Sequence, residues 1–246
     1  MLFRSDAFNL DAELARREDR RDKTIITIDP ATARDFDDAI ELTPLPNGGF
    51  ELGVHIADVA AFVIDGSPLD ADARLRANSV YFPNYVVPML PELLSNGLCS
   101  LQQDQDRLVK SAFIRYDAKG KVTKTRLARC VIRSTQRLTY EQATAILDGA
   151  PDAPDITPAV KTLLADMDRL ARIIRQRRLD HGMLVLDLPE VDLILDEQGA
   201  IIDARPADTS FSHTIIEMFM VEANEAVART LDPRRAPFLR RFHPEP

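Results

Sequence analysis

Residues 28–39 read IDPATARDFDDA, and four of these twelve residues are the aspartates Asp29, Asp35, Asp37 and Asp38. The stretch follows a short β-branched run at residues 25–28. Because Pro30 disfavours helical backbone at the residue before it, the run predicts a strand that ends at Asp29. The next alternating segment begins at Asp38, so the aspartates span a single connection between two strands. The sequence therefore predicts a dense group of carboxylates at the end of a strand.

Such a group of carboxylates points to divalent cations. Two carboxylates about 4 Å apart repel each other by roughly 4 kcal/mol at an effective dielectric constant near 20. Asp35 and Asp37 share one face of an extended segment, Asp38 lies on the other, and Asp29 arrives from the preceding strand. Hard oxygen ligands select Mg²⁺, with Mn²⁺ as the alternative. One or two such ions would serve phosphodiester hydrolysis, in which they activate a water and stabilise the leaving oxygen.

The same spacing of aspartates also occurs in two other kinds of structure. A polar surface loop remains open on spacing alone, because Asp is common in turns. A calcium-binding EF-hand is excluded, since the twelfth position counted from Asp35 is Pro46 and that counted from Asp29 is Ile40, where a glutamate is needed. Arg34 is expected to balance the charge of the loop rather than to contact a phosphate.

Patterns on either side of the aspartates predict a mixture of strands and helices. Alternation of apolar and polar residues predicts three β-hairpins, at residues 38–42 with 50–57, 112–116 with 122–132, and 191–195 with 200–204. Helical spacing of apolar residues predicts two long helices, at residues 160–178 and 214–231. A shorter helix is expected after Thr139, because Thr139 and Gln142 fit a capping box and Gly149 fits the C′ position. This helix would place Tyr140 in an exposed first turn.

The composition is that of a soluble globular protein. The 246 residues are 45% hydrophobic and 28% charged, enough for one large domain or two small ones. Neither a signal peptide nor an apolar run of membrane-spanning length is present, and the two cysteines are typical of a reducing compartment. We therefore expect a cytoplasmic protein without a membrane partner, and the sequence indicates no obligate protein partner.

Charge is unevenly distributed along the chain. Residues 1–23 are highly charged and are interpreted as a connector, while the folded domain is expected to occupy residues 24–246. The formal net charge of −8 disfavours nucleic-acid binding by bulk attraction. Residues 118–140 nevertheless contain no acidic side chain and seven basic ones: Lys119, Lys121, Lys124, Arg126, Arg129, Arg133 and Arg137. This basic stretch predicts either a nucleic-acid contact or an ordinary solvated hairpin.

Residues 28–39 closely resemble the motif I-D-x-x-x-A-x-D-F-D-D-A, which opens the catalytic (RNB) domain of the ribonuclease II and ribonuclease R family. The resemblance continues in the family's order through the blocks GVHIADV (53–59), SVY (79–81), VPMLP (87–91), CSL (99–101), LTY (138–140), PE (189–190), IE (216–217) and ANE (223–225). It covers about residues 20–246. It implies an α+β fold of the RNB type at residues 24–246, in which curved antiparallel strands and packed helices hold the aspartates at the floor of a narrow RNA channel.

The activity implied by this resemblance is processive, metal-dependent hydrolysis of single-stranded RNA from the 3′ end, releasing nucleoside 5′-monophosphates. The four aspartates match the family's metal ligands and organisers of the attacking water, with Mg²⁺ as the expected cofactor and Mn²⁺ as the alternative. Tyr81 and Tyr140 match aromatic positions that contact the last nucleotides, and stacking contributes about 1–3 kcal/mol per base. Glu217 matches a glutamate that contacts a ribose 2′-hydroxyl, the group that distinguishes RNA from DNA.

Structural roles are the alternatives for several of these positions. Tyr81, which lies between Val80 and Phe82, is equally typical of a buried strand tyrosine, and Glu217 of a solvated helix residue. His55 and Asp58 are expected to support the site by hydrogen bonding rather than to perform chemistry.

The sequence departs from the family pattern in two places. Leu186 stands where some relatives have a phenylalanine that stacks on the terminal base. The later Ser-Pro-Ile-Arg-Arg-Tyr block, which supplies a catalytic arginine, and the flanking cold-shock and S1 barrels have no counterpart in this sequence. We therefore expect a C-terminally truncated catalytic domain with weak activity or none. A non-catalytic RNA-binding remnant and a metal-binding interaction module without RNA remain the alternatives.

Overall fold

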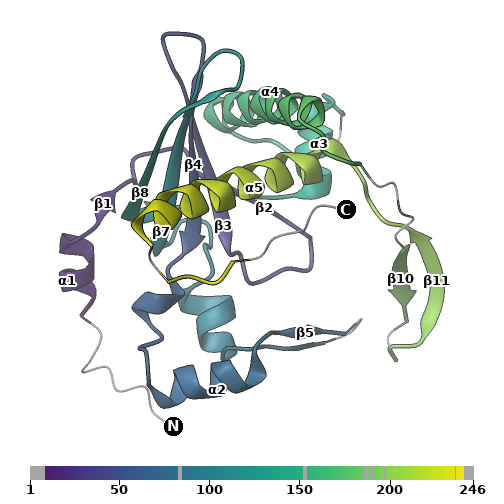
Figure 1. Ribbon diagram of the computed structural model, residues 1–246. Coiled ribbons are helices and arrows are strands. Elements are labelled where there is room, and N and C mark those ends of the chain that lie inside the picture. Colours follow the sequence, from purple (N-terminus) through teal and green to yellow (C-terminus); the bar gives the residue numbers. More distant parts are fainter. Residues whose placement is uncertain are drawn as a thin grey trace.

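The computed structural model describes residues 9–82, 85–151, 154–185, 188, 191–196, 198–235 and 237–240 of the chain. A seven-stranded sheet forms its centre, and three helices cover one face of that sheet (Figure 1). Two small hairpins project from this body (Figure 1). The fold is therefore α+β, as the sequence predicts.

The central sheet is mostly antiparallel, in the order β1-β8-β7-β4-β3-β2-β9. Its strands are β1 (Glu18–Asp19), β2 (Ile26–Asp29), β3 (Asp38–Pro44), β4 (Phe50–Ala57), β7 (Asp106–Tyr116), β8 (Val122–Arg133) and β9 (Gln136–Thr139). The predicted hairpins β3–β4 and β7–β8 are both present. The two outermost strands are the exceptions to antiparallel pairing, since β1 pairs with β8 and β9 pairs with β2 in parallel.

The helices that cover the sheet begin and end close to the predicted positions. They are α3 (Tyr140–Leu147), α4 (Pro158–Asp180) and α5 (Phe211–Leu231). The capping box at the start of α3 is present: the Thr139 hydroxyl accepts from the Gln142 amide at 3.2 Å, and the Gln142 side chain accepts from the Thr139 amide at 2.9 Å. Gly149 follows this helix with a φ of 66°, a backbone conformation that glycine adopts readily.

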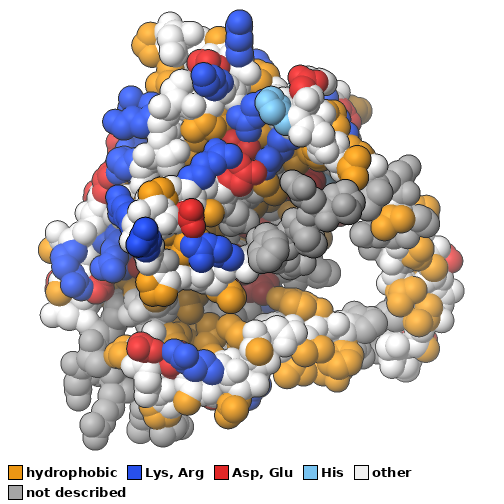
Figure 2. Space-filling model, in the orientation of Figure 1, with side chains coloured by type: hydrophobic (Ala, Val, Ile, Leu, Met, Phe, Trp, Pro, Cys, Tyr) orange, Lys and Arg blue, Asp and Glu red, His pale blue; other side chains and the backbone are white. Residues whose placement is uncertain are grey.

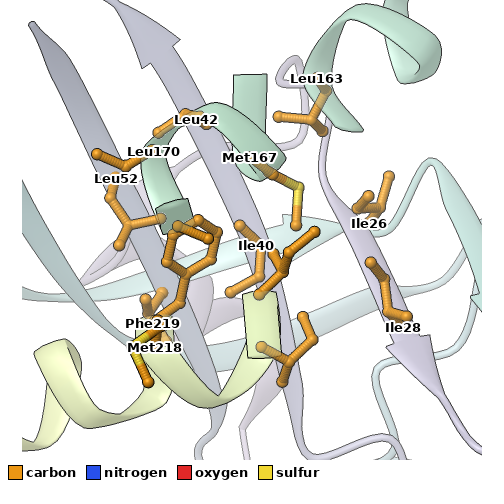
Figure 3. Close-up of a cluster of buried hydrophobic side chains, with 14 of the residues drawn as sticks. Ile26, Ile28, Ile40, Leu42, Leu52, Leu163, Met167, Leu170, Met218 and Phe219 are labelled. Atoms are coloured by element: carbon orange, nitrogen blue, oxygen red, sulfur yellow. The ribbon is translucent and has the colours of Figure 1, made fainter. Parts of the chain in front are cut away.

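Alternation along the strands gives the sheet two buried faces. One face packs against the helices, and there Ile40 belongs to the same buried cluster as Met167 of α4 and Phe219 of α5 (Figure 3). The opposite face carries a smaller cluster that includes Ile25, Phe113 and Leu94. Leu94 belongs to η3 (Leu93–Leu98), a short π-helical segment. Strand β2 is buried along its whole length because both of its faces are covered.

The folded part of the chain reaches further toward the N-terminus than the predicted start at residue 24. Helix α1 (Leu10–Ala15) leads into β1, which joins the edge of the sheet. The buried guanidinium of Arg17 pairs with Asp58 at 2.7 Å, and Arg20 pairs with Glu41. The charged residues of this segment therefore find partners far along the chain, which a local sequence pattern does not reveal.

Two hairpins lie outside the central sheet. The first joins β5 (Val80–Tyr81) to β6 (Val86–Val87), close to α2 (Pro68–Arg76) and the 3₁₀ turn η2 (Val59–Ala61) (Figure 1). The second joins β10 (Val191–Leu195) to β11 (Ile201–Pro206) and confirms the third predicted hairpin. The chain's last described turn is η4 (Asp232–Arg234). Each helix in the described residues is too short or too polar to cross a bilayer.

Candidate active site

The four aspartates occur at one end of the central sheet. Asp29 is the last residue of β2 and Asp38 is the first of β3, and these antiparallel neighbours are joined by residues 30–37. Asp29 is 8% exposed, Asp35 and Asp38 are half-buried, and Asp37 is exposed. The strand end predicted at Asp29 is confirmed. In the space-filling view the surface is hollowed between the sheet-and-helix body and the segment that contains α2 and β5 (Figure 2).

The connecting loop is held in place by hydrogen bonds to a distant segment. The amide of Phe36 donates to the Ser100 hydroxyl at 3.1 Å, and that hydroxyl donates to the Arg34 carbonyl at 2.7 Å. The amide of Leu101 donates to the Phe36 carbonyl at 2.8 Å, and that of Ala57 donates to the Asp37 carbonyl at 3.0 Å. The loop that carries the aspartates is therefore fixed by the block at residues 99–101, whose role the sequence alone does not explain.

Burial and mutual repulsion make these carboxylates unusually ready to bind a cation or a proton. Burial, followed by the charge of Asp38, raises the pKa of Asp29 to about 7. Burial and then Asp37 raise the pKa of Asp38 to about 6. Asp37 is exposed as a residue, but the atoms around its carboxyl partly desolvate it, and this desolvation, followed by the charge of Asp35, raises its pKa. The buried Oδ2 of Asp29 also has no hydrogen-bond partner in the part of the chain that the structure describes. Like charges that are close together and partly desolvated are the setting in which such shifts arise.

The carboxylate oxygens are of the type that binds a hard divalent cation, although within the described residues they are too far apart to coordinate one together. Four carboxylates, one of them with an unpaired buried oxygen, are the oxygen ligands that Mg²⁺ and Mn²⁺ prefer. Within the described residues, no group of three or more His, Cys, Asp or Glu side chains is close enough to hold a metal ion. Binding of a cation would therefore require these side chains to move closer together.

Tyr81 lies beside the aspartates and is open to solvent. Its side chain is 67% exposed, and its hydroxyl donates to Oδ2 of Asp35 at 3.3 Å. The pKa of Tyr81 is raised, first by burial of the hydroxyl and then by the charge of Asp35. The alternative of a core tyrosine is therefore wrong. The ring stands on the short strand β5 and is accessible from solvent.

Tyr140 is close enough to two of the aspartates for their charges to act on it. It is the first residue of α3 and follows Thr139, which pairs with Asp29 across β9 and β2. Burial, followed by the charges of Asp38 and Asp29, raises the pKa of Tyr140 to about 12. The predicted first-turn position is confirmed, but the prediction of an exposed ring is wrong. The ring is half-buried because the imidazole of His213 stacks on it, a contact from α5 that no local pattern announces.

Glu217 lies apart from this group. It is an exposed residue of α5 and lines a pocket of about 870 Å³ together with Lys121, Arg177, Arg178 and Arg229. No contact in the described part of the chain links it to the aspartates. The structure thus brings Tyr81 and Tyr140 to the carboxylates but not Glu217, for which a solvated helix position remains open.

His55 and Asp58 have the supporting character that the sequence predicts. His55 is fully buried, with Nδ1 2.8 Å from the Ser111 hydroxyl, and burial lowers its pKa. Burial raises the pKa of Asp58, but Arg17 and Lys110 outweigh it and bring this pKa below its usual value. Asp58 is paired with Arg17 at 2.7 Å and with Lys110 at 3.1 Å. Both residues therefore stabilise the sheet behind the aspartates.

The basic stretch at residues 118–140 is partly neutralised by carboxylates from elsewhere. Arg126 pairs with Glu18 at 2.6 Å, and Arg133 pairs with Asp106 at 2.7 Å. Arg137 instead reaches the aspartate loop, where it donates to the Pro30 carbonyl at 2.9 Å. Its charge lowers the pKa of Asp29, against the larger effect of burial. Only part of the local positive charge is thus available to a nucleic acid.

Almost the whole chain is similar in sequence to proteins of one known family. Residues 17–246 match the family model described as RNB domain. The chain belongs to the RNB-domain family. It is 42% identical over 235 residues to ribonuclease R of Thermotoga maritima, covering 95% of this chain and 33% of that protein. The chain spans about one third of the length of the curated relatives it matches.

Solved structures of ribonuclease R have the same fold. Mycoplasma genitalium RNase R in complex with double-stranded RNA superposes with a TM-score of 0.89 at 34% identity, covering 94% of this chain and 41% of that one. The same enzyme in complex with ribose-methylated single-stranded RNA gives a TM-score of 0.88 at 35% identity, covering 93% of this chain and 36% of the other. The RNB-type fold is therefore confirmed. Leu186 and the PE block at residues 189–190 lie outside the described residues, as do residues 241–246 at the end of the region of resemblance.

Proposed function

We propose that this chain carries the metal-binding part of a 3′→5′ exoribonuclease site, which hydrolyses single-stranded RNA and releases nucleoside 5′-monophosphates. The observation that carries this proposal is the group of carboxylates with raised pKa values at the ends of β2 and β3, with the exposed Tyr81 hydroxyl on Asp35. Membership of the RNB family and the RNA complexes of M. genitalium RNase R support an RNA substrate.

Each residue has a distinct role in this proposal. Asp29, Asp35, Asp37 and Asp38 would hold Mg²⁺ or Mn²⁺, which supplies the positive charge that activates a water and stabilises the leaving 3′ oxygen. The same carboxylates orient the attacking water toward the phosphorus. The exposed ring of Tyr81 offers a stacking surface to a terminal base. Tyr140, on which the charges of Asp38 and Asp29 act, would limit how the terminal nucleotide can lie.

A non-catalytic RNA-binding domain is the second candidate. The observation that favours it is that the carboxylates, within the described residues, are not close enough to form a metal cage.

The decisive experiment is digestion of a 5′-labelled single-stranded RNA by the whole chain with Mg²⁺. The proposal expects a ladder that shortens from the 3′ end and disappears in Asp37→Asn. Asp168→Asn, on the outer side of α4 and paired with Arg172, is the matched control and should leave the ladder unchanged. RNA that binds without shortening would establish the second candidate. Absence of RNA binding at low salt, where phosphate contacts are strongest, would exclude both and favour a metal-binding interaction module.

A further inference from the structure

A second cavity adjoins the aspartates on the side of the β5–β6 hairpin. Its volume is about 360 Å³, within the range of about 300–1,000 Å³ that is usual for small-molecule pockets. Its walls come from the aspartate loop (Arg34 and Asp35), from the hairpin (Tyr85 and Val86) and from η3 (Asn96). Asp35 thus belongs both to the carboxylate group and to this pocket, so a molecule that leaves the carboxylates can enter the pocket directly.

One wall offers an aromatic surface that is already oriented. The Tyr85 ring stacks on Phe82, with centroids 4.6 Å apart and an angle of 11° between the planes. Tyr85 is 54% exposed, so the stack covers one face of its ring and leaves the other accessible. Aromatic side chains with an accessible face bind nucleobases by stacking, with little preference among bases. This wall therefore suits a flat heterocycle.

The remaining walls provide both donors and acceptors of hydrogen bonds. The Ser79 hydroxyl accepts from the Met89 amide at 2.9 Å and also forms a hydrogen bond with the Tyr81 hydroxyl, so it connects this wall to the tyrosine beside Asp35. Asn96 accepts from Ser95 through Oδ1 at 3.2 Å, which leaves its amide protons available. The guanidinium of Arg34 has no ion pair within the described ranges, whereas Asp35 and Glu92 contribute carboxylates. A base edge and a ribose use both kinds of partner, and a phosphate requires the cation.

We propose that this pocket is a product subsite, which binds the released nucleoside 5′-monophosphate with its base on Tyr85 and its phosphate toward Arg34. Arg34 thereby receives a phosphate contact that its position in the sequence did not lead us to expect. The inference rests on the proposed function. In that reaction the water oxygen bonds to phosphorus, the bond from phosphorus to the 3′ oxygen breaks, and a proton passes to that oxygen. The phosphate therefore stays with the released nucleotide, which must leave the carboxylates before the next phosphodiester arrives. The pocket beside Asp35 receives it.

The test is calorimetric titration of the whole chain with adenosine 5′-monophosphate, adenosine and inorganic phosphate, all in EDTA so that no metal ion bridges the ligand to the aspartates. Tyr85→Ala should weaken both AMP and adenosine, by about tenfold for the loss of one base stack, while Tyr85→Phe should restore binding. Arg34→Gln should weaken AMP and leave adenosine unchanged. Leu75→Ala on α2 and Lys119→Gln at the tip of the β7–β8 hairpin are controls that remove an exposed apolar side chain and a charge elsewhere.

The outcomes separate this inference from the proposed function. No AMP binding, or AMP binding that Tyr85→Ala and Arg34→Gln leave unchanged, would overturn the subsite even if the chain shortens RNA. AMP binding that depends on both residues supports the subsite. If the same chain then fails to shorten RNA, the pocket stands as a mononucleotide site and the proposed hydrolysis falls.

Discussion

The imidazole of His213 lies nearly parallel to the ring of Tyr140, with the two centroids 3.7 Å apart and 16° between the planes. His213 is in the first turn of α5 and Tyr140 begins α3. Nε2 of His213 is also 3.3 Å from Oδ2 of Asp208, and this second contact helps to fix the orientation of the imidazole. The orientation of an aromatic ring beside the aspartates thus depends on a helix that follows it by about seventy residues in the sequence.

Removal of this stack is expected to weaken RNA binding without unfolding the chain. In His213→Ala the Tyr140 ring gains rotational freedom, and we expect RNA affinity to fall by about tenfold, as for the loss of one aromatic contact. Fluorescence anisotropy with a labelled single-stranded RNA measures the affinity, and circular dichroism checks the fold. His213→Phe keeps a flat ring and should restore binding. Equal affinity of the alanine variant and the parent chain would show that the stack does not position Tyr140.

The stability of the metal-free chain should fall as pH rises. Asp29 and Asp38 have folded-state pKa values of about 7 and about 6, above the usual value for Asp of about 3.9 in unfolded chains. Their protonation therefore stabilises the fold fully below about pH 4, and this contribution is lost as pH rises through 6 and 7. Since one pKa unit corresponds to about 1.4 kcal/mol, Asp29→Asn should raise the free energy of unfolding at pH 7.5 by about 2–4 kcal/mol.

Denaturant melts of both chains in EDTA at pH 5 and pH 7.5 measure this effect. Asp168→Asn serves as the control, because that carboxylate is paired with Arg172 on the outer side of α4. A parent chain that is equally stable at both pH values would contradict the proposed repulsion among the aspartates.

A divalent cation should reverse this loss. A ligand at a hundred times its dissociation constant stabilises a folded chain by about 2.7 kcal/mol. We therefore expect Mg²⁺ or Mn²⁺ to raise the Tm at pH 7.5 and to have a smaller effect at pH 5, where protons occupy Asp29 and Asp38. Thermal melts with the metal and with EDTA measure the difference. The shift should disappear in Asp38→Asn, and its persistence there would place the cation elsewhere.

The pair of Arg17 and Asp58 predicts a large loss of stability from a residue far from the aspartates. Both side chains are buried, and Arg17 also donates to the Val109 carbonyl at 3.2 Å. Within the described residues, Arg17→Gln leaves Asp58 with only the exposed Lys110 as its ion-pair partner, and breaking a buried pair costs about 3–5 kcal/mol. The neighbouring side chain of Arg16 is 61% exposed, so Arg16→Gln should cost less than about 1 kcal/mol. Urea denaturation distinguishes the two, and equal losses would refute the argument.

Local patterns predict most of the elements but not the way they combine. The hairpins β3–β4 and β7–β8, the helices α4 and α5 and the capping box at Thr139 depend on residues close in the chain, and each is present. The parallel edge strands β1 and β9 depend on partners about a hundred residues away, so alternation alone does not indicate them. Two parallel strands are not joined by a hairpin turn, so no turn residues in the sequence indicate that they pair.

The same distinction applies to the candidate site. The aspartates are adjacent in sequence, so their grouping follows from the chain itself. The exposure of Tyr81 and the covering of Tyr140 by His213 depend on tertiary packing and could not be predicted. Arg34 and Tyr85 carry no motif that suggests a pocket, because its walls come from three separate segments.

The pairing of β2 with β9 sets the order in which the site can be assembled during translation. Strand β2 pairs with β3 at a single residue, Ile26 with Ile40, but with β9 along its whole length, from Ile26 with Gln136 to Asp29 with Thr139. A ribosome must therefore add about a hundred residues after β2 before the strand that carries Asp29 gains its main neighbour. We expect the nascent chain to hold its acidic loop on an incomplete sheet until β9 has been synthesised.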